Sequence, residues 1–307
     1  MAAAGEPARD GAAPGLLLGA LAAVGFSGKA VIIKLAYAYP VDAVTLLALR
    51  MLFSLPFFAA MAVWSGRNPA YRMRRSDRIG IVALGFLGYY LASYLDFLGL
   101  HYISAGLERL ILFLYPTMVL ILSALVLRQP ITRLHLMALA LSYGGIVLVF
   151  LDNLRLGESA GATALGSLLV FGSALAYAIY LVWGGGLITR LGAVRFTAYA
   201  MTVASFFCIL QFLLTRPLSA LALPAPVYGY SVLMAILCTV FPVWAVSEAI
   251  RRVGASRVAL VSAVGPVATI FLGYLFLGEP ITVIQLAGAA LVLAGVAMLS
   301  LKKQPAG

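Results

Sequence analysis

Seven ionisable side chains lie inside long apolar stretches of this sequence, where a charged group usually faces a cavity or a partner. They are Lys29, Lys34, Arg50, Asp96, Glu108, Arg109 and Glu248. The first six combine four basic with two acidic groups and therefore carry a surplus of positive charge. That surplus could receive a carboxylate, and either acidic group could exchange protons if burial favours its neutral form.

The same residues also have a purely structural interpretation. Arg50 could pair with Asp96 or Glu108 and hold neighbouring helices together, since breaking a buried pair destabilises a protein whatever its role. Basic residues near the end of an apolar stretch could instead extend to a polar interface. Glu248 lies four residues before Arg252, which favours a local ion pair along one helix.

Aromatic side chains form a second set of candidate binding residues. They are Tyr94, Tyr115, Tyr177, Tyr180 and Trp244. Tyr115 follows Glu108 by seven residues and therefore shares its helix face. A tyrosine hydroxyl deep in an apolar stretch needs a partner, which favours a hydrated cavity suited to aromatic or amphipathic solutes. The alternative is a belt of aromatic residues at the two membrane interfaces.

The composition defines the elements that must position these groups. The chain has 307 residues, of which 64% are apolar and 10% charged, and its mean hydropathy is +1.06. These values exclude a soluble enzyme, a disordered chain and a disulfide scaffold, because so few charges cannot cover so much apolar surface. A membrane helix needs about 20 apolar residues, which predicts an all-α integral membrane protein with ten transmembrane helices. The predicted spans are 15–37, 42–64, 79–100, 104–127, 132–151, 163–185, 193–214, 226–250, 255–277 and 281–301.

Basic residues are distributed unevenly over the predicted loops. If the N-terminus is cytoplasmic, the inner loops and tails hold 15 of the 21 Lys and Arg residues, and the outer loops hold only Arg155 and Arg216. This is the positive-inside pattern, and it explains most of the net charge of +11 without nucleic acid as a partner. We therefore expect a multi-pass protein in a lipid bilayer with both chain ends in the cytoplasm.

The chain resembles itself at an offset of 150 residues. Positions 103–150 and 253–300 share 13 identities in 48 aligned positions, among them Pro116 with Pro266 and the two Pro-Ile-Thr turns. The matched loops differ in charge, because Arg128 and Arg133 flank the first turn and Glu279 precedes the second. An inverted duplication of five helices predicts this reversal, since equivalent loops then face opposite sides.

Inverted repeats of this kind are typical of transporters, and they place the binding region at interrupted helices. Pro116 and Pro266 each remove a backbone hydrogen bond and can kink their helices. We therefore predict that these two prolines act as hinges or gating joints near a central cavity.

The two halves resemble the EamA-type branch of the drug/metabolite transporter superfamily. The most characteristic piece is LGEPIT (Leu277–Thr282) followed by QLAGAALVLAGV (Gln285–Val296). FSGKAVIIK (Phe26–Lys34) is similar to the lysine-ended first helix of that family, and SALAYAIYLV (Ser173–Val182) to its sixth helix. The chain departs from the pattern at Gln129, where the family more often has Glu.

The resemblance implies a domain organisation. It predicts a disordered N-terminal tail (1–14), a first five-helix repeat (15–151), an outer linker (152–162), a second five-helix repeat (163–301) and a short basic tail (302–307). It implies an inner-membrane carrier that exports an amino acid or another small metabolite by alternating access. The family's fifth and tenth helices often serve packing or dimer contacts, which leaves a homodimer open.

No catalytic residue set, nucleotide loop or His/Cys metal cluster is recognisable, so the sequence predicts neither an enzyme nor a cofactor. Cys208 and Cys238 have the character of small packing residues. Four alternatives remain open, namely a solute carrier coupled to an ion or driven by the solute gradient, a proton-coupled antiporter of cationic drugs, a lipid-modifying membrane enzyme, and a non-transporting membrane protein.

Overall fold

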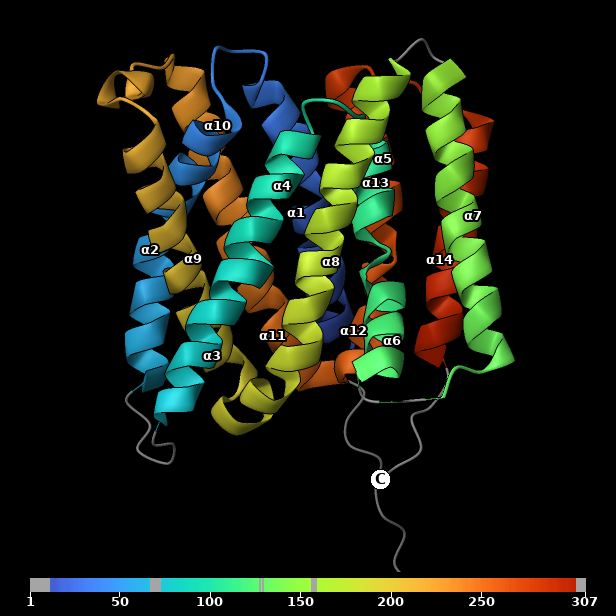
Figure 1. Cartoon of the computed structure of the whole chain (residues 1–307), viewed down its shortest axis with the longest axis horizontal. Helices are drawn as coiled ribbons and strands as arrows, with labels where there is room; N and C mark the ends of the chain where they lie inside the picture. The colour runs from blue at the N-terminus through green and yellow to red at the C-terminus, as the bar shows by residue number, and fades with distance from the viewer. Residues whose placement is uncertain (1–11, 67–72, 127, 129, 156–158, 302–307) are drawn as a thin grey trace, which may run out of the picture.

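The structure, a computed structural model, describes residues 12–66, 73–126, 128, 130–155 and 159–301, and within these residues it contains helices and no strands. The elements in chain order are α1 (Ala12–Ala36), α2 (Ala43–Gly66), α3 (Arg75–Gly85), η2 (Phe86–Leu91), α4 (Ala92–Gly99), α5 (Ala105–Leu112), α6 (Tyr115–Val126), α7 (Arg133–Arg155), α8 (Ala160–Leu191), α9 (Ala193–Thr215), η3 (Leu218–Leu221), α10 (Ala225–Ala235), η4 (Ile236–Val240), α11 (Phe241–Val253), α12 (Ala255–Ser262), α13 (Val264–Leu277) and α14 (Val283–Leu301). The helices stand side by side along one direction (Figure 1).

The predicted ten-helix membrane fold is confirmed. Eight helical stretches are long and apolar enough to cross a membrane, and two shorter apolar helices, Val264–Leu277 and Val283–Leu299, complete the second half. Each predicted span overlaps one of these stretches, although the span 255–277 is divided between α12 and α13 and the span 163–185 ends six residues before the end of α8. The fold therefore follows from apolar length, as the sequence predicts.

Several predicted boundaries need correction. Ala12–Pro14 of the predicted N-terminal tail already belong to α1, while residues 1–11, Gln129 and 302–307 lie outside the described part of the chain. The predicted linker 152–162 is too long, because α7 continues to Arg155 and α8 starts at Ala160. Helix α8 ends only at Gly192, whose positive φ of 82° suits a glycine.

The two repeats share irregularities that lie 150 residues apart. A π-helical segment starts at Phe86 in the first repeat and at Ile236 in the second. A helix break follows in each repeat, after Leu112 at the end of α5 and after Ser262 at the end of α12. The connection from α4 to α5 lies at one end of the bundle, whereas the equivalent connection from α11 to α12 lies at the other end (Figure 1). The repeats are therefore inverted relative to each other, as their charges predict.

The prolines explain where the two helices break. Pro116 and Pro266 lie four residues after Leu112 and Ser262, the residues at which α5 and α12 end. Because proline has no N–H to donate to the carbonyl group four residues earlier, each proline removes the hydrogen bond that would cross the break. Pro56 lies within the continuous helix α2, so proline favours these breaks without being sufficient for them. The role of the two breaks as moving joints stays a prediction.

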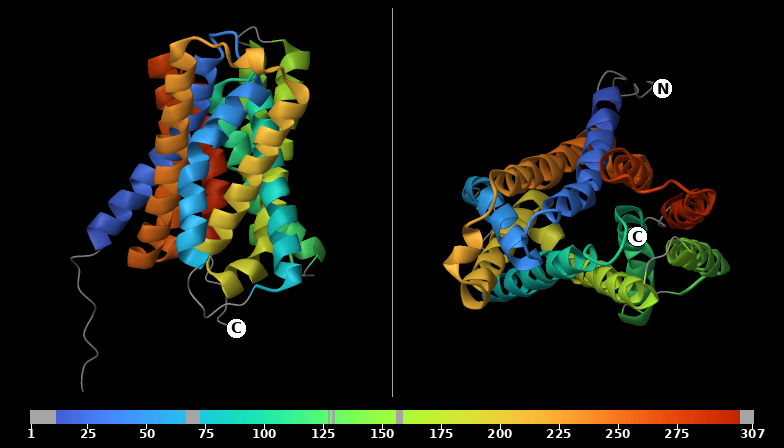
Figure 2. Two further views of the ribbon diagram at one scale, coloured as in Figure 1. Left: turned by 90° about the vertical axis from the view of Figure 1, so that its left-hand side faces the viewer. Right: turned by 90° about the horizontal axis from the view of Figure 1, so that it is seen from above.

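The first helix of each repeat packs against the other repeat's equivalent partners. Helix α1 packs on α11 and α13, whereas α8 packs on α4 and α6. Two pairs of matching helices, α2 with α9 and α7 with α14, flank this centre, as the view from above shows (Figure 2). Residues of α1, α4 and α5 are thereby brought together from distant parts of the first repeat.

The pair of α7 and α14 offers a stability test on two adjacent glycines. A Cβ atom on Gly145 would lie 2.5 Å from the carbonyl oxygen of Gly288, whereas a Cβ on Gly144 would meet nothing within 4 Å. We expect Gly145→Ala to destabilise the protein by about 1–3 kcal/mol, because the helix backbones must separate. Thermal unfolding in detergent measures this effect, and Gly144→Ala is the matched control. Equal melting temperatures for the two variants would contradict the close packing.

The two ends of the bundle differ in charge. We call one end the basic end, because the ends of α3, α7, α8, α9, α11 and α12 that meet there carry most of the arginines in the described loops and helix ends (Figure 1). These arginines are Arg74, Arg75, Arg78, Arg128, Arg133, Arg190, Arg195, Arg251, Arg252 and Arg257. The opposite end carries Arg155 and Arg216. The uneven distribution of basic residues that the sequence predicts is therefore present between the two ends of the bundle.

Candidate functional site

A cluster of charged side chains lies where α1, α2, α4 and α5 meet; we call it the charged cluster and define it as Lys29, Arg50, Asp96, Glu108 and Arg109. The ammonium group of Lys29 contacts both carboxylates, directly at Asp96 Oδ2 and at 3.3 Å from Glu108 Oε1. Asp96 is 2% exposed and Glu108 is 0% exposed, so this contact lies out of bulk solvent. One lysine therefore holds two buried acidic groups from different helices.

The two arginines of the charged cluster have different neighbours. The Nε atom of Arg50 donates a hydrogen bond of 2.9 Å to Thr239 Oγ1, and its guanidinium lies 5.6 Å from the ring centre of Phe97. The guanidinium of Arg109 lies against α13, where a Cβ atom on Gly265 would come within 2.9 Å of Nη2. The glycine at position 265 thus makes room for this arginine.

The structural alternative in which Arg50 pairs with Asp96 or Glu108 is not what the structure shows: among the described residues Arg50 forms no ion pair, and Lys29 contacts both acidic groups. The sequence places Lys29 inside the first apolar stretch, but helical periodicity alone cannot show which neighbour a side chain faces. That choice depends on how α1 packs against α4 and α5. The local pair expected for Glu248 is confirmed, since Arg252 Nε lies 2.7 Å from Glu248 Oε1.

A second polar contact joins the repeats at the end opposite the basic end. Lys34 Nζ lies 3.2 Å from Glu279 Oε1 and donates a hydrogen bond of 2.9 Å to the carbonyl oxygen of Ile103. The carboxylate of Glu279 also accepts the backbone N–H of Ala105 at 2.9 Å. An acidic group at this position satisfies free N–H groups and suits the positive end of the α5 dipole. The sequence interpretation used Glu279 only as a loop charge before the second Pro-Ile-Thr turn and missed this role.

Further hydrogen bonds reinforce the same end. Ser104 donates from Oγ to Asn153 Oδ1 at 3.0 Å, and Thr282 donates to Asp152. Nearby, partial burial lowers the pKa of the His101 imidazole below its ordinary value, so the ring is predominantly neutral at pH 7. These contacts connect α5, α7 and the turn before α14.

Three of the predicted aromatic residues form one group with Tyr89. Tyr115 and Tyr177 have ring centres 5.3 Å apart, and Tyr177 and Tyr180 have ring centres 5.7 Å apart. Tyr180 is buried against Phe196 and donates a long hydrogen bond of 3.4 Å to the hydroxyl of Tyr89. Tyr180 is therefore a core residue of this group, which lies where α6 and η2 pack on α8.

The structure does not place the other two predicted aromatics in this group. Tyr94 stacks on Tyr90 within α4 and η2, with ring centres 6.4 Å apart. Trp244 lies beside Phe241 on α11 and is 55% exposed. Tyr94 and Trp244 lie 150 residues apart and so occupy equivalent positions in the two repeats, but their ring contacts are with different partners.

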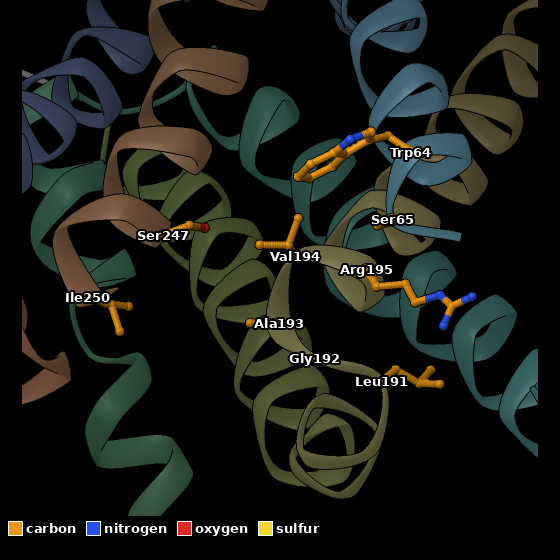
Figure 3. A pocket seen from close by; sticks show the side chains of 9 residues that line it. All are labelled: Trp64, Ser65, Leu191, Gly192, Ala193, Val194, Arg195, Ser247 and Ile250. Atoms are coloured by element: carbon orange, nitrogen blue, oxygen red, sulfur yellow. The ribbon is translucent and has the colours of Figure 1, made fainter. Parts of the chain in front are cut away.

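A cavity of about 450 Å³ opens at the basic end between α2, α11 and the connection from α8 to α9. Its lining residues, shown in Figure 3, are Trp64, Ser65, Leu191, Gly192, Ala193, Val194, Arg195, Ser247 and Ile250. No predicted site residue lines this cavity. Within the described part of the chain, no three His, Cys, Asp or Glu side chains gather in a way that could hold a metal ion.

Two membrane-embedded five-helix repeats in inverted orientation, with a cluster of buried charges in the first repeat, define the class of helical transport proteins with internal repeats. The model of the EamA-like transporter family matches residues 13–151 and again residues 164–301. The chain belongs to this family.

Individual relatives agree with this assignment. "Uncharacterized transporter YcbK" of Bacillus subtilis is 32% identical over 285 residues, which cover 90% of this chain and 89% of that protein. An "Uncharacterized transporter" of Archaeoglobus fulgidus is 30% identical over 232 residues, covering 76% and 81% of the two chains. A solved structure titled "Crystal structure of protein" has a TM-score of 0.61 at 18% identity, covers 93% of this chain and 96% of its own, and supports the fold alone.

Proposed function

We propose that this protein is a secondary or facilitative carrier that exports a small metabolite, such as an amino acid, by alternating access. The observation that carries the proposal is the buried charged cluster at the meeting point of α1, α2, α4 and α5 in an inverted-repeat transporter fold. Ionisable groups at such a place mark a substrate or ion pathway. Neither a cofactor nor a covalent step is part of the proposed mechanism.

The two ends of the bundle support alternating access. At the opposite end, Lys34 and Glu279 join the repeats, whereas a cavity is open at the basic end. We assign the basic end to the cytoplasm of a cell with an inner membrane, in keeping with the positive-inside rule. We further propose that solute enters from the cytoplasmic side and that the breaks before Pro116 and Pro266 are the joints of the movement.

Solute flux into proteoliposomes tests this proposal. The purified protein is reconstituted, and flux is measured for a panel of amino acids, organic anions and cationic dyes, with protein-free liposomes as the control. We expect saturable flux of a carboxylate-bearing solute above the control. Absence of flux for every solute would remove the carrier proposal.

The same assay separates the alternative mechanisms. Flux of amino acids that persists after the proton gradient is collapsed would indicate transport without proton coupling. Proton-dependent flux of cationic dyes would instead favour the antiporter alternative. Asp96→Asn in folded protein should abolish flux if the charged cluster takes part, and normal flux would leave Asp96 with a structural role.

A further inference from the structure

The charged cluster contains more buried positive charge than its own acidic groups neutralise. Lys29 contacts both Asp96 and Glu108, and with Arg50 and Arg109 the cluster holds three basic groups against two acidic groups. Neither Arg50 nor Arg109 has an ion-pair partner among the described residues. Buried charges are normally paired, because an unpaired charge in a low-dielectric region is strongly unfavourable.

Both arginines also have unused hydrogen-bond donors. Arg50 is only 7% exposed, and its buried Nη1 atom has no hydrogen-bond partner among the described groups. The buried Nε atom of Arg109 also has no hydrogen-bond partner among the described groups. Leaving such a donor unsatisfied is unfavourable, especially on a charged group. The two arginines therefore supply both the positive charge and the hydrogen-bond donors that an anion would need.

Both arginines lie against the second repeat. Arg109 lies beside Gly265 of α13, and Gly28, next to Lys29 on α1, lies beside η4, since a Cβ atom on Gly28 would come within 3.6 Å of Cys238 Sγ. Arg50 bonds to the neighbouring Thr239, whose hydroxyl in turn donates to the carbonyl oxygen of Met234 at 2.9 Å. A π-helical turn of this kind is frequent at functional sites.

We infer that Arg50, which bonds to Thr239 of η4, and Arg109, which lies against Gly265 of α13, bind the carboxylate of an organic monoanion or of a zwitterion. One negative charge neutralises the surplus that remains after Lys29, Asp96 and Glu108 are counted together. A guanidinium group suits this task, because its planar array of donors matches a carboxylate. This inference rests on the proposed function and names the chemical group by which the carrier would select its solute.

Ligand-dependent thermal stability tests the inference without measuring flux. Purified protein in detergent is titrated at constant ionic strength with benzoate, which carries a carboxylate, or with benzylammonium, which carries a positive charge on a similar ring. We expect benzoate to raise the melting temperature in a saturable manner, because a ligand that binds the folded state stabilises it. Chloride and benzylammonium should give no such rise.

Arginine variants identify the site. Arg50→Gln and Arg109→Gln should each weaken benzoate binding by roughly 10- to 100-fold, as expected for a lost hydrogen bond to a charged group. Arg109→Lys keeps the charge and should retain part of the affinity. Arg252→Gln is the matched control, since Arg252 pairs with Glu248 at the basic end and should leave benzoate binding unchanged.

The outcomes are distinct from those of the flux assay. No stabilisation by benzoate, or equal stabilisation by chloride, would overturn a carboxylate site in the unmodified protein. Undiminished benzoate binding in both folded glutamine variants would overturn the assignment to these arginines. Benzoate binding without flux of any solute would retain the site and remove the carrier function, whereas flux of cations alone would remove the anion site and retain the carrier.

Discussion

Lys29→Met should destabilise the protein by about 3–5 kcal/mol, the effect expected when one partner of a buried ion pair is removed. In this variant the carboxylates of Asp96 and Glu108 lose the ammonium group that contacts both of them. Two buried acidic groups would then face each other without that cation. Methionine keeps most of the side-chain volume, so the loss is mainly electrostatic. The melting temperature in detergent and the yield of monodisperse protein measure the effect.

The neighbouring lysine provides the control for this experiment. Lys34 lies on the same helix and also forms an ion pair, but its side chain is 27% exposed and Glu279 is 16% exposed. Lys34→Met should therefore lower stability less, because solvent weakens the interaction. Adding Asp96→Asn to Lys29→Met should restore part of the lost stability, since one uncompensated charge disappears. If Lys29→Met were as stable as the unmodified protein, the bridging role of Lys29 would be wrong.

Glu279→Ala should open the end of the bundle opposite the basic end. The substitution removes the acceptor for the Ala105 N–H and the partner of Lys34 in one step. Loss of a helix cap and of a partly exposed ion pair amounts to about 1–3 kcal/mol together. A change of 1.4 kcal/mol alters an equilibrium constant about tenfold. The population of molecules in which this end of the bundle is open should therefore rise markedly.

Hydrogen exchange at the start of α5 measures this opening directly. The amides of Ala105 and Gly106 should exchange faster in Glu279→Ala than in the unmodified protein. Glu279→Gln is the informative companion, because its amide oxygen can still accept the Ala105 N–H while the charge is lost. We expect intermediate exchange in this variant. Unchanged exchange in Glu279→Ala would show that the carboxylate does not stabilise this end.

The sequence by itself predicts the helices, their number and the inversion of the repeats. Apolar stretches of sufficient length form helices in a membrane because every backbone group must be satisfied internally. The distribution of the basic residues predicts which side of the membrane each loop faces, and the offset of 150 residues aligns Pro116 with Pro266. These features are local or periodic, so they can be identified without knowledge of packing.

The two π-helical segments cannot be predicted from apolar length, charge or periodicity. Phe86–Leu91 and Ile236–Val240 occupy equivalent places in the repeats, yet their sequences FLGYYL and ILCTV have little in common. A π turn changes the register of a helix by less than one turn. No composition or period in these short stretches distinguishes it from an ordinary apolar helix.

Tertiary structure alone decided which charges meet. The sequence identified Lys29 among the embedded ionisable groups, but it suggested Arg50 as the partner of Asp96 or Glu108. The packing of α1, α4 and α5 selected Lys29 instead, and it left Arg50 bonded to Thr239 from the other repeat. The physical reason is that the position of a residue in the sequence determines how deep its side chain lies along a helix. Which partner the side chain meets depends on the rotation of that helix and on its neighbours. The rotation and the neighbours are set by the packing of all the helices together.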